Sequence, residues 1–505
     1  MPRLSKLTYH RGTLLLHPPP RGKAWIDYAT WDDRVEKFRI RAIHYRPLIE
    51  ALQGEGTSFT DEAKEFVPLE LASRAEMTPY PHQEEALQAW KMAGRRGVVV
   101  LPTASGKTYL AQLAMQSTPR STLILVPTLD LMHQWYAQLE VAFPDVELGL
   151  LGGGSGDRTP LLVATYNSAA IHSENLGNRY AFLIFDECHH LPTDFFRKIA
   201  EDAIAPYRLG LTATPERSDG SHRELESLIG AIVYRKTPEE LSGQALAEHR
   251  TVQIKVKLSP QEREKYDRAI KIRNDFLRQS KINLGSLKGW QLFVQASARS
   301  QAGRRAMLAH REAKDISLCT DGKLSVLAEL IEEHYPERTL IFTNDNATVY
   351  RISQEFLIPA LTHQTPVKER HNILTQFKEG TYKIIAASHV LNEGVDVPDA
   401  RIAIILSGTG SIREYVQRLG RVLRKGSQKD KLAILYEVVS EDTSEERTSK
   451  RRKGQNDWQK PKSRKKSAES KPKQLEIIEI PSPYETPSHS VPKAAESSGK
   501  YESEK

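Results

Sequence analysis

The sequence predicts an α/β protein with two tandem parallel-sheet lobes. Apolar runs of strand length lead through polar or glycine-containing turns into helical patterns, and this alternation occurs in two separate parts of the chain. A chain of 505 residues is too long for one hydrophobic core, so roughly three or four domains are expected. We expect a small N-terminal α+β domain, two lobes, a helical insert between them and a disordered C-terminal tail. The predicted limits are 1–75 for the N-terminal domain, 76–235 and 316–445 for the two lobes, 236–315 for the linker and insert, and 446–505 for the tail.

The composition favours an intracellular protein with a polyanionic partner. The chain has only two cysteines, and it lacks an N-terminal apolar segment and any apolar run long enough to cross a bilayer. These features predict a cytoplasmic, nucleoid-associated protein with no membrane partner. The net charge of +8 and the isoelectric point near 9.1 favour binding to nucleic acid.

The N-terminal domain opens with a hairpin-like segment, LTYHRGTLLL, and then mixes aromatic residues with arginines. Trp25 and Trp31 are candidates for stacking on bases. Aromatic side chains usually form the core of so small a domain, and we therefore expect these two in the core.

The first lobe contains VVVLPTASGKTYLAQL, which is typical of a phosphate-binding loop. Residues 98–101 indicate a buried strand, and residues 102–106 lead into a helix that begins near Lys107. The Lys107 ammonium would reach the β- and γ-phosphates, and the Thr108 hydroxyl would ligate Mg²⁺. The backbone N–H groups expected around the phosphates include those of Ala104, Ser105 and Gly106. Because Leu101 and Ala104 stand where glycine is common, we expect the loop to turn there without strained dihedrals.

The segment AFLIFDECHH supplies the other half of a Mg-ATP hydrolysis site. A buried strand, residues 182–185, delivers Asp186 and Glu187 at its C-terminal end, where ligands bind in open α/β sheets. Asp186 would hold Mg²⁺ through water, and Glu187 would act as general base toward the attacking water. His189 beside a cysteine suggests a metal site, but the other cysteine, Cys319, is far along the chain. We therefore interpret His189 as a coupling residue.

These two segments resemble those of superfamily 2 helicases of the DExH type, and further motifs of that family follow in order. LILVPTLDLMHQW, VATYNS and LTATP resemble motifs Ia, Ic and III. Each is a strand followed by a Ser or Thr hydroxyl, as phosphate-backbone contacts require. Each alone is better explained as an ordinary strand end with a helix N-cap, whereas the series favours the helicase. The resemblance places Thr128 and Thr165 on nucleic acid and makes Thr212 and Thr214 coupling residues.

Gln83, in MTPYPHQEEALQAW, resembles the glutamine with which the family reads the adenine edge. An ordinary helix N-terminus explains this residue equally well.

The insert contains two helical stretches that neither lobe needs. Ser259 as N-cap, Pro260 at the first helical position and Glu262 completing a capping box predict the start of a charged helix. A second stretch includes Trp290 to His310. Two long helices with a polar surface predict a projecting hairpin that would grip duplex or track a single strand; the alternative is an arm packed on the second lobe.

The second lobe contains RTLIFTNDN, YKIIAASHVLNEGVDVPDARIAIILS and SIREYVQRLGRVLRKG, which resemble motifs IV, V and VI. In a helix, Gln417, Arg421 and Arg424 share one face. Arg421 and Arg424 would then act as arginine fingers across the cleft between the lobes, although such a run is more usually a solvated basic face. The resemblance assigns Thr343 and Ser388 to nucleic acid, Gln417 to nucleotide, and Gly394 and Asp396 to both.

Longer segments are similar to prokaryotic XPB-type DNA repair helicases. LNEGVDVPDA, TATPERSDG and LSGTGSIREYVQRLGRVLRKG carry this resemblance, which extends from LTYHRGTLLL to TSEERTSKRRK. It implies RecA-like lobes, an N-terminal damage-recognition-like domain and a thumb-like insert. An Arg-Glu-Asp loop follows motif III in that family. Here the loop reads Arg217, Ser218 and Asp219, so the middle acid is absent; the resemblance places Arg217 on nucleic acid.

The tail from residue 446 is rich in Lys and Arg and then in Pro and Ser, which predicts disorder and contact with DNA phosphates. Within it, LEIIEI at residues 475–480 is either a strand-addition peptide for a partner or a chance apolar cluster.

The sequence therefore predicts an ATP- and Mg²⁺-dependent DNA helicase or translocase whose lobes close on ATP and reopen after hydrolysis. By resemblance, it would move 3′ to 5′ on single-stranded and forked DNA in nucleotide excision repair, with a nuclease or a transcription or repair protein as partner. Two alternatives remain open. One is an RNA-directed DExH ATPase; the other is a DNA-bound ATPase clamp that anchors a partner without processive unwinding.

Overall fold

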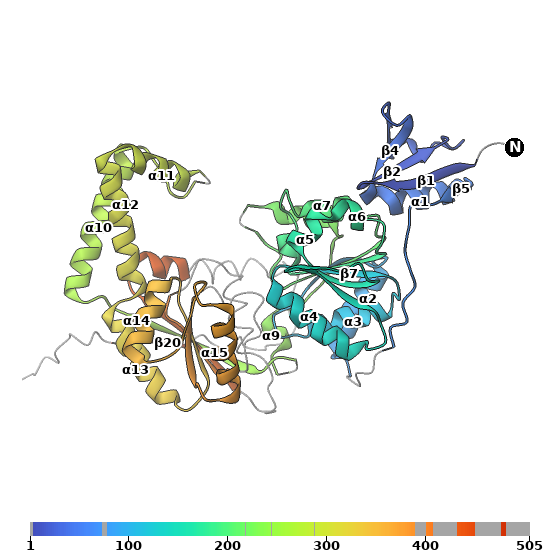
Figure 1. Cartoon of the computed structure of the whole chain (residues 1–505). Helices are drawn as coiled ribbons and strands as arrows, with labels where there is room; N and C mark the ends of the chain where they lie inside the picture. The colour runs from blue at the N-terminus through green and yellow to red at the C-terminus, as the bar shows by residue number, and fades with distance from the viewer. Residues whose placement is uncertain are drawn as a thin grey trace, which may run out of the picture.

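The computed structural model describes residues 4–72, 78–217, 219–243, 245–286, 288–388, 400–407, 432–449 and 476–480. Their strands form three sheets, one in the N-terminal domain and one in each lobe. Figure 1 shows the N-terminal domain against the first lobe, on the side away from the second lobe. Within the described ranges, no helix is long and apolar enough to span a membrane.

The N-terminal domain is a five-stranded sheet in the order β3-β4-β2-β1-β5, packed on one helix. LTYHRGTLLL forms the predicted hairpin, with Arg11 and Gly12 in left-handed conformations between the two strands. Trp25 lies in the core, as expected, whereas Trp31 is 46% exposed and corrects that expectation, because it lies on an open face of the sheet against Phe38. The elements are β1 (Ser5–His10), β2 (Thr13–His17), β3 (Ala29–Asp32), β4 (Lys37–Arg41), α1 (Tyr45–Gly54) and β5 (Phe59–Asp61).

The first lobe (lobe 1) is an eight-stranded sheet in the order β13-β6-β12-β11-β7-β10-β8-β9, parallel except for β9. Because β6, β12 and β11 are neighbours, the loops that follow them lie at one edge of the sheet. Its strands are β6 (Arg96–Val100), β7 (Thr122–Val126), β8 (Leu148–Gly152), β9 (Ser155–Gly156), β10 (Leu161–Thr165), β11 (Phe182–Asp186), β12 (Tyr207–Thr212) and β13 (Ile232–Arg235). Its helices are α2 (Pro81–Met92), α3 (Lys107–Gln116), α4 (Leu129–Ala142), α5 (Tyr166–Ile171), α6 (Ser173–Leu176), α7 (Arg197–Glu201) and α8 (Leu225–Leu228).

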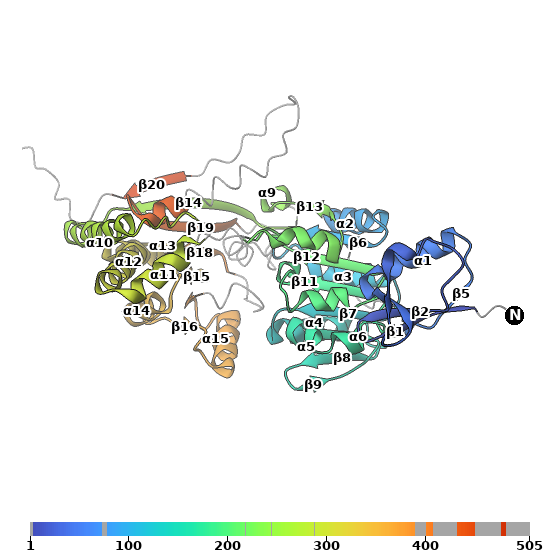
Figure 2. The same cartoon turned by 90° about the horizontal axis from the view of Figure 1, so that it is seen from above.

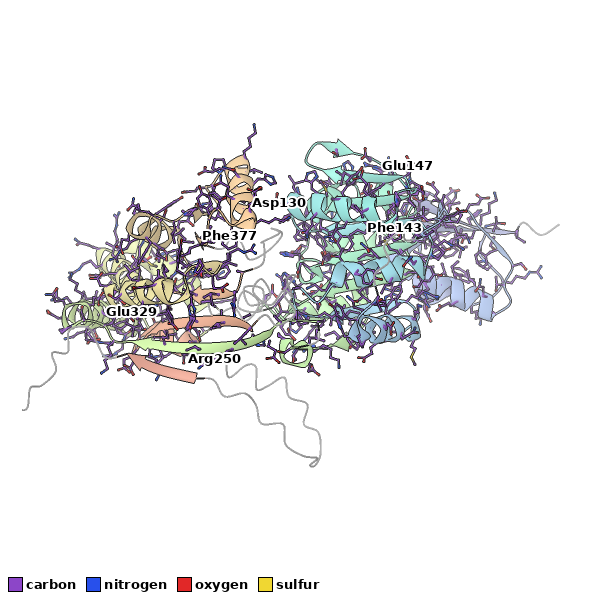
Figure 3. The ribbon with its side chains drawn as sticks, turned by 90° about the horizontal axis from the view of Figure 1, so that it is seen from below. Asp130, Phe143, Glu147, Arg250, Glu329 and Phe377 are labelled. Atoms are coloured by element: carbon purple, nitrogen blue, oxygen red, sulfur yellow. The ribbon has the colours of Figure 1, made fainter. Side chains whose placement is uncertain are left out.

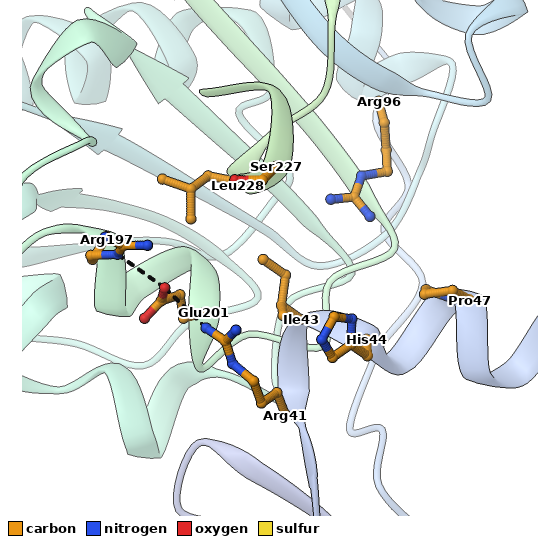
Figure 4. A pocket seen from close by; sticks show the side chains of 9 residues that line it. All are labelled: Arg41, Ile43, His44, Pro47, Arg96, Arg197, Glu201, Ser227 and Leu228. Atoms are coloured by element: carbon orange, nitrogen blue, oxygen red, sulfur yellow. Dashed lines mark hydrogen bonds and ion pairs between the residues drawn. The ribbon is translucent and has the colours of Figure 1, made fainter. Parts of the chain in front are cut away.

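The N-terminal domain is fixed to lobe 1 by polar contacts. Arg46 on α1 donates to the carbonyl oxygen of Pro206 (3.2 Å), and Arg41 pairs with Glu201 on α7 (3.0 Å). A cavity of about 230 Å³ lies between the N-terminal domain and lobe 1. Arg41 and Arg197 line this cavity, and their guanidinium groups point toward Glu201 (Figure 4). The cavity is at the opposite end of β6 from the phosphate-binding loop, since Arg96 at the start of that strand lines it.

The insert is a helical hairpin that projects from the second lobe (Figure 1). The predicted capping box is confirmed, because Ser259 and Glu262 exchange side-chain-to-backbone hydrogen bonds. Arg263 donates to the carbonyl oxygens of Glu441 (2.9 Å) and Asp442 (3.1 Å), so the base of the hairpin is anchored on lobe 2. Its helices are α10 (Pro260–Gln279), α11 (Gly289–Arg299) and α12 (Gln301–Leu318).

The second lobe (lobe 2) is a parallel sheet in the order β16-β17-β15-β18-β19-β14-β20. Residues 248–256, which we had placed in the linker and insert, form β14 of this sheet. Its strands are β14 (Glu248–Val256), β15 (Thr339–Phe342), β16 (Ala360–Leu361), β17 (Ile384–Ala387), β18 (Ile402–Ile405), β19 (Leu432–Ser440) and β20 (Glu476–Ile480). The helices are α13 (Asp321–His334), α14 (Asn346–Phe356) and α15 (Val367–Glu379), with α9 (Pro238–Leu241) in the linker.

The tail is not without structure throughout, which corrects our expectation for residues 446–505. Ser449 is buried, and β20 lies within the tail. The expectation missed β20 because a five-residue island of β-prone residues is hidden in a polar, basic composition, and it gains its order from an open strand edge.

A buried ion pair holds lobe 2 together. The Lys323 ammonium on α13 lies 2.6 Å from the Glu445 carboxylate, and neither side chain is more than 2% exposed. The same ammonium donates to the carbonyl oxygen of Leu406, directly after β18. The pair therefore joins a helix, a strand end and the segment after β19.

Replacing Lys323 with methionine should lower the free energy of unfolding of lobe 2 by about 3–5 kcal/mol, because Glu445 would remain buried without its cation. Urea unfolding measures this change. The matched control is Arg268→Met, which breaks a 2.6 Å pair whose side chains are 67% and 72% exposed, and should cost less than about 1 kcal/mol. Equal losses in the two variants would contradict the role of the buried pair.

Candidate active site

The phosphate-binding loop turns sharply into α3. The helix begins at Lys107, as predicted, and Gly106 caps it with a φ of +82°. The Lys107 ammonium lies 3.2 Å from the carbonyl oxygen of Leu101 and 3.9 Å from a Glu187 carboxylate oxygen. The loop after β6 and the loop after β11 therefore meet at this lysine.

The expectation of unstrained dihedrals in this loop was wrong at Ala104. Its φ is +68°, in the left-handed region that favours glycine. A residue with a Cβ in this region costs roughly 1–2 kcal/mol of conformational free energy, and the packing around the loop must offset that cost. Ala104 and Gly106 are left-handed and Ser105 between them is not. Adjacent residues of opposite hand form a concave nest of backbone N–H groups, which suits an anion.

Gln83 is engaged by this loop. Its side-chain oxygen accepts from the Tyr80 backbone N–H (2.9 Å), and its amide donates to the carbonyl oxygens of Ser105 and Gly106 (both 3.2 Å). His82 contacts the Ser105 carbonyl oxygen through Nε2 (2.9 Å). The start of α2 therefore holds the phosphate-binding loop, a role for His82 that the sequence gave no reason to expect.

Asp186 ends β11 inside the protein. Its carboxylate accepts from Trp135 Nε1 (2.8 Å) and from the Glu187 backbone N–H (3.0 Å), and Tyr166 Oη donates to its backbone oxygen (3.0 Å). Burial, followed by the neighbouring Glu187 carboxylate, raises the pKa of Asp186. A divalent cation at this carboxylate would oppose that rise. Trp135 and Tyr166 lie in the segments that resemble motifs Ia and Ic, but the sequence analysis assigned no role to either residue.

Glu187 has a left-handed backbone with a φ of +47°, which turns its side chain toward Lys107. Its Oε2 atom is buried, lies 3.4 Å from His189 Nδ1 and makes no hydrogen bond within the described ranges. Strained backbone and a buried acceptor are typical of reactive positions. The arrangement is suited to a carboxylate that takes a proton from water.

His189 continues a chain of contacts toward motif III. Its Nδ1 atom lies 3.1 Å from Thr212 Oγ1, and that hydroxyl oxygen accepts from the Thr214 backbone N–H (3.2 Å). All three predicted coupling residues are buried. The structure therefore brings Glu187, His189, Thr212 and Thr214 into one connected network.

Arg217 reaches back to this network from the loop after motif III. Its Nη1 donates to the His189 carbonyl oxygen (2.9 Å), while Nε and Nη2 pair with Asp219 (2.7 Å at the closest). The side chain is 21% exposed. Its guanidinium is thus engaged within lobe 1, although the resemblance had placed it on nucleic acid.

The threonine hydroxyls predicted to contact nucleic acid are engaged locally. Thr128 and Thr165 cap α4 and α5, accepting from the backbone N–H groups of Leu131 (3.3 Å) and Ser168 (3.2 Å). Thr165, Thr343 and Ser388 are buried. The structure therefore gives each capping threonine the local role that we had weighed as its alternative.

Several residues singled out in the sequence analysis lie outside the described ranges. They are Ser218, Gly394, Asp396, Gln417, Arg421 and Arg424.

The donor set fits a Mg²⁺-nucleotide. Thr108 stands in the first turn of α3, and Asp186 and Glu187 lie at the adjacent strand end. Thr103 Oγ1, within the loop, is buried and has no hydrogen-bond partner among the residues that the structure describes. Hard oxygen donors beside a helix N-terminus are what a magnesium phosphate requires.

Three family models match the chain. Residues 7–63 match the Xeroderma pigmentosum group B helicase damage recognition domain, residues 76–217 the type III restriction enzyme res subunit, and residues 322–426 the helicase conserved C-terminal domain. The chain is also 38% identical to the DNA 3′-5′ translocase XPB2 of Sulfurisphaera tokodaii, over 88% of this chain and 99% of that protein. The chain belongs to the XPB family of superfamily 2 helicases. The N-terminal domain and the first lobe therefore match two separate family models.

More distant XPB proteins are longer than this chain. The helicase/translocase subunit XPB/SSL2 of the general transcription and DNA repair factor IIH of Saccharomyces cerevisiae is 27% identical, over 81% of this chain and 46% of that protein. Among solved structures, the Hef helicase domain of Pyrococcus furiosus is 19% identical, with a TM-score of 0.49, over 74% of this chain and 97% of that domain.

Trp135→Phe tests the support of Asp186. The variant keeps an aromatic ring and removes the Nε1–H donor, so the Mg²⁺ concentration for half-maximal ATP hydrolysis should rise about 10–100-fold. Titration of Mg²⁺ at fixed ATP measures this. Trp90→Phe is the matched control, because Trp90 is equally buried but donates to the Arg208 carbonyl oxygen. A parental Mg²⁺ requirement in Trp135→Phe would contradict the assignment.

Proposed function

We propose that this XPB-family chain is an ATP-dependent DNA helicase or translocase that moves 3′ to 5′ and acts in nucleotide excision repair. The observation that carries the proposal is the network Lys107–Glu187–His189–Thr212, in which the phosphate-binding loop, the AFLIFDECHH segment and motif III touch at adjacent strand ends. Such a network links the residues proposed to hydrolyse ATP to motif III, whose position can change with the state of the nucleotide. A DNA substrate would keep the protein with the nucleoid.

In this proposal, the residues of lobe 1 bind and orient Mg-ATP. The N–H groups of residues 104–106 and the start of α3 would hold the phosphates, and Lys107 would turn from Leu101 toward them. Thr108 and Asp186 would hold Mg²⁺, which would neutralise phosphate charge when bound. The Glu187 carboxylate would then take the proton of the attacking water.

Hydrolysis would reach DNA through the buried network. When Lys107 turns toward phosphates, Glu187 loses its nearby cation, and the His189–Thr212 contact must adjust. Thr212 and Thr214 begin the segment that leads to Arg217, so an adjustment there would be passed along the same loop. Arg217 holds this loop and the AFLIFDECHH segment together through the His189 carbonyl oxygen.

Lobe 2 would complete the site across the cleft. Arg421 and Arg424 are proposed to stabilise the charge on the γ-phosphoryl group, with Gln417, Gly394 and Asp396 beside the nucleotide. Asp130 on α4 pairs with Arg370 on α15 (3.6 Å), on the side of lobe 1 that faces lobe 2 (Figure 3). Thr128, Thr165, Thr343 and Ser388 remain proposed DNA contacts, and the three buried ones would need a local rearrangement that exposes them.

Matched DNA and RNA forks test the proposal. We expect DNA to stimulate ATP hydrolysis and to be unwound from a 3′ single strand, while RNA of the same sequence does neither. Glu187→Gln should keep ATP binding and lose about 10²–10⁴-fold in turnover, whereas Glu264→Gln, on the exposed surface of α10, should match the parent. Stimulation by RNA would favour the RNA-directed ATPase, and stimulated hydrolysis without strand separation would favour the clamp.

Arg217→Ala tests whether this arginine positions the hydrolytic centre. Loss of the bond to the His189 carbonyl oxygen should lower turnover about tenfold, both with and without DNA, at a nearly constant KM for ATP. Arg217→Lys should recover little, because an ammonium cannot reproduce the fork of donors. The control is Arg223→Ala, an exposed arginine in the same loop region. Slower unwinding at parental ATPase would instead place Arg217 on the DNA.

A further inference from the structure

The cavity between the N-terminal domain and lobe 1 is lined mainly by basic side chains. Arg41 and His44 come from the N-terminal domain, and Arg96 and Arg197 come from lobe 1. Glu201 is the one carboxylate among the described residues that line it. In Figure 4 the Arg96 guanidinium points into this space and lies apart from Glu201 and its two arginine partners. Residues of both units therefore surround a space with an excess of positive charge.

Two of the arginines are balanced by carboxylates. Glu201 Oε1 lies 3.0 Å from Arg41 Nη2 and 3.0 Å from Arg197 Nε. Arg197 also pairs through Nη1 with Glu224 (2.9 Å). Two acids and two guanidinium groups together carry no net charge, so the excess lies elsewhere in the wall of the cavity.

Arg96 carries part of this excess. Its Nε donates to the Ile229 carbonyl oxygen (3.2 Å), and its guanidinium makes no other hydrogen bond or ion pair with the residues that the structure describes. A guanidinium has five N–H donors, so four of them remain for a ligand. Burial, followed by the charge of Arg46, lowers the pKa of Arg96. The surroundings of Arg96 therefore oppose its positive charge.

A second guanidinium without a carboxylate lies behind the wall of the cavity. Arg208 is fully buried, and its hydrogen bonds within the described chain go to backbone carbonyl oxygens, among them that of the lining residue Leu228. Burial, and after it the charge of Arg96, lowers the pKa of Arg208. Two guanidinium groups withdrawn from water without an acid are costly unless an anion is near.

The cavity has the size and the opening for a small anion. Its volume of about 230 Å³ lies below the roughly 300–1,000 Å³ of pockets that enclose drug-sized ligands. It therefore suits a phosphate group rather than a whole nucleotide. The Arg41 side chain is 61% exposed, so an ion can enter past it. Because so exposed an ion pair is weak, Arg41 can turn from Glu201 toward a doubly charged ligand.

We propose that this cavity binds a phosphate dianion, either free or at the end of a nucleic acid strand, between Arg96 of lobe 1 and Arg41 of the N-terminal domain. Each guanidinium can offer a fork of donors to the phosphate oxygens. His44 and Arg197 line the same space and would add a ring N–H and positive charge. The bound ion would join the two units, so the attachment of the damage-recognition-like domain to lobe 1 would depend on phosphate.

Calorimetric titration of the full chain with inorganic phosphate tests the site. Because the phosphate-binding loop also attracts phosphate, Lys107→Ala is the background, without Mg²⁺ or nucleotide. We expect this background to bind phosphate, and Arg96→Gln should weaken the binding at least tenfold, since charge-assisted hydrogen bonds are lost. Arg41→Gln should weaken it severalfold, and its exposed position keeps the fold intact. The control is Arg223→Gln, which removes an exposed arginine outside the lining and should bind like the background.

Amide hydrogen exchange locates the ion. Phosphate should slow exchange at residues 42–46 and 227–230, which border the cavity in the N-terminal domain and in lobe 1. Arg96→Gln should abolish this protection. Should that variant fail to fold, Arg41→Gln provides the comparison. Phosphate binding that Lys107→Ala removes, or protection confined to residues 101–108, would place the ion at the phosphate-binding loop and overturn the proposal.

Two single strands of one sequence, with and without a 5′-phosphate, identify the source of the dianion. Displacement of phosphate by the phosphorylated strand alone would assign the site to a strand end, and displacement by neither strand would assign it to free phosphate. Equal displacement by both would show no selection of a terminal dianion and would overturn the proposal.

A diffuse charge effect has its own signature. Phosphate binding that stays unchanged in both Arg96→Gln and Arg41→Gln, or that chloride of the same ionic strength abolishes, would overturn a built site. These measurements include no ATP hydrolysis or unwinding, so their failure leaves the proposed function untouched. A helicase that lacks DNA-stimulated ATPase would in turn leave the phosphate cavity untouched.

Discussion

The buried carboxylate of Asp186 is the constraint around which lobe 1 is arranged. An ionised carboxylate inside a protein is costly unless it is hydrogen-bonded and near a cation. Trp135 and the Glu187 backbone N–H supply the hydrogen bonds, and Lys107 supplies the nearby charge. The site is therefore stable only when α4, β11 and the start of α3 keep their relative positions, which the parallel sheet enforces. A magnesium ion would supply part of the positive charge that Lys107 supplies beside Asp186 here.

The sequence predicted the parts of this site that depend on local pattern. A strand followed by a GKT turn specifies where α3 begins, and a capping box specifies where α10 begins, because both depend on neighbouring residues. Trp135, His82 and the inward turn of Arg217 could not be found in this way. Each acts on a segment distant in sequence, and its partner is often a backbone oxygen that no side-chain pattern reveals. The predicted backbone conformation of Ala104 was wrong for a related reason, since tertiary packing there overrides the local dihedral preference.

The contacts divide the described chain into two mechanical units. The N-terminal domain is fixed to lobe 1 through Arg41 and Arg46, and the helical hairpin is fixed to lobe 2 through Arg263. Closing the lobes on ATP would therefore move the damage-recognition-like domain relative to the hairpin, while each keeps its contacts with its own lobe. DNA held by both would be displaced by the difference between the two lobe positions, which is how an interlobe motion becomes translocation.

Strand β14 links that motion to the tail. It leaves the linker between the lobes, enters the sheet of lobe 2, and pairs there with β19 on one side and β20 on the other (Figure 2). Because the hairpin is also anchored on lobe 2 through Arg263, a movement of that lobe toward ATP would carry β14, its paired strands and the hairpin as one unit.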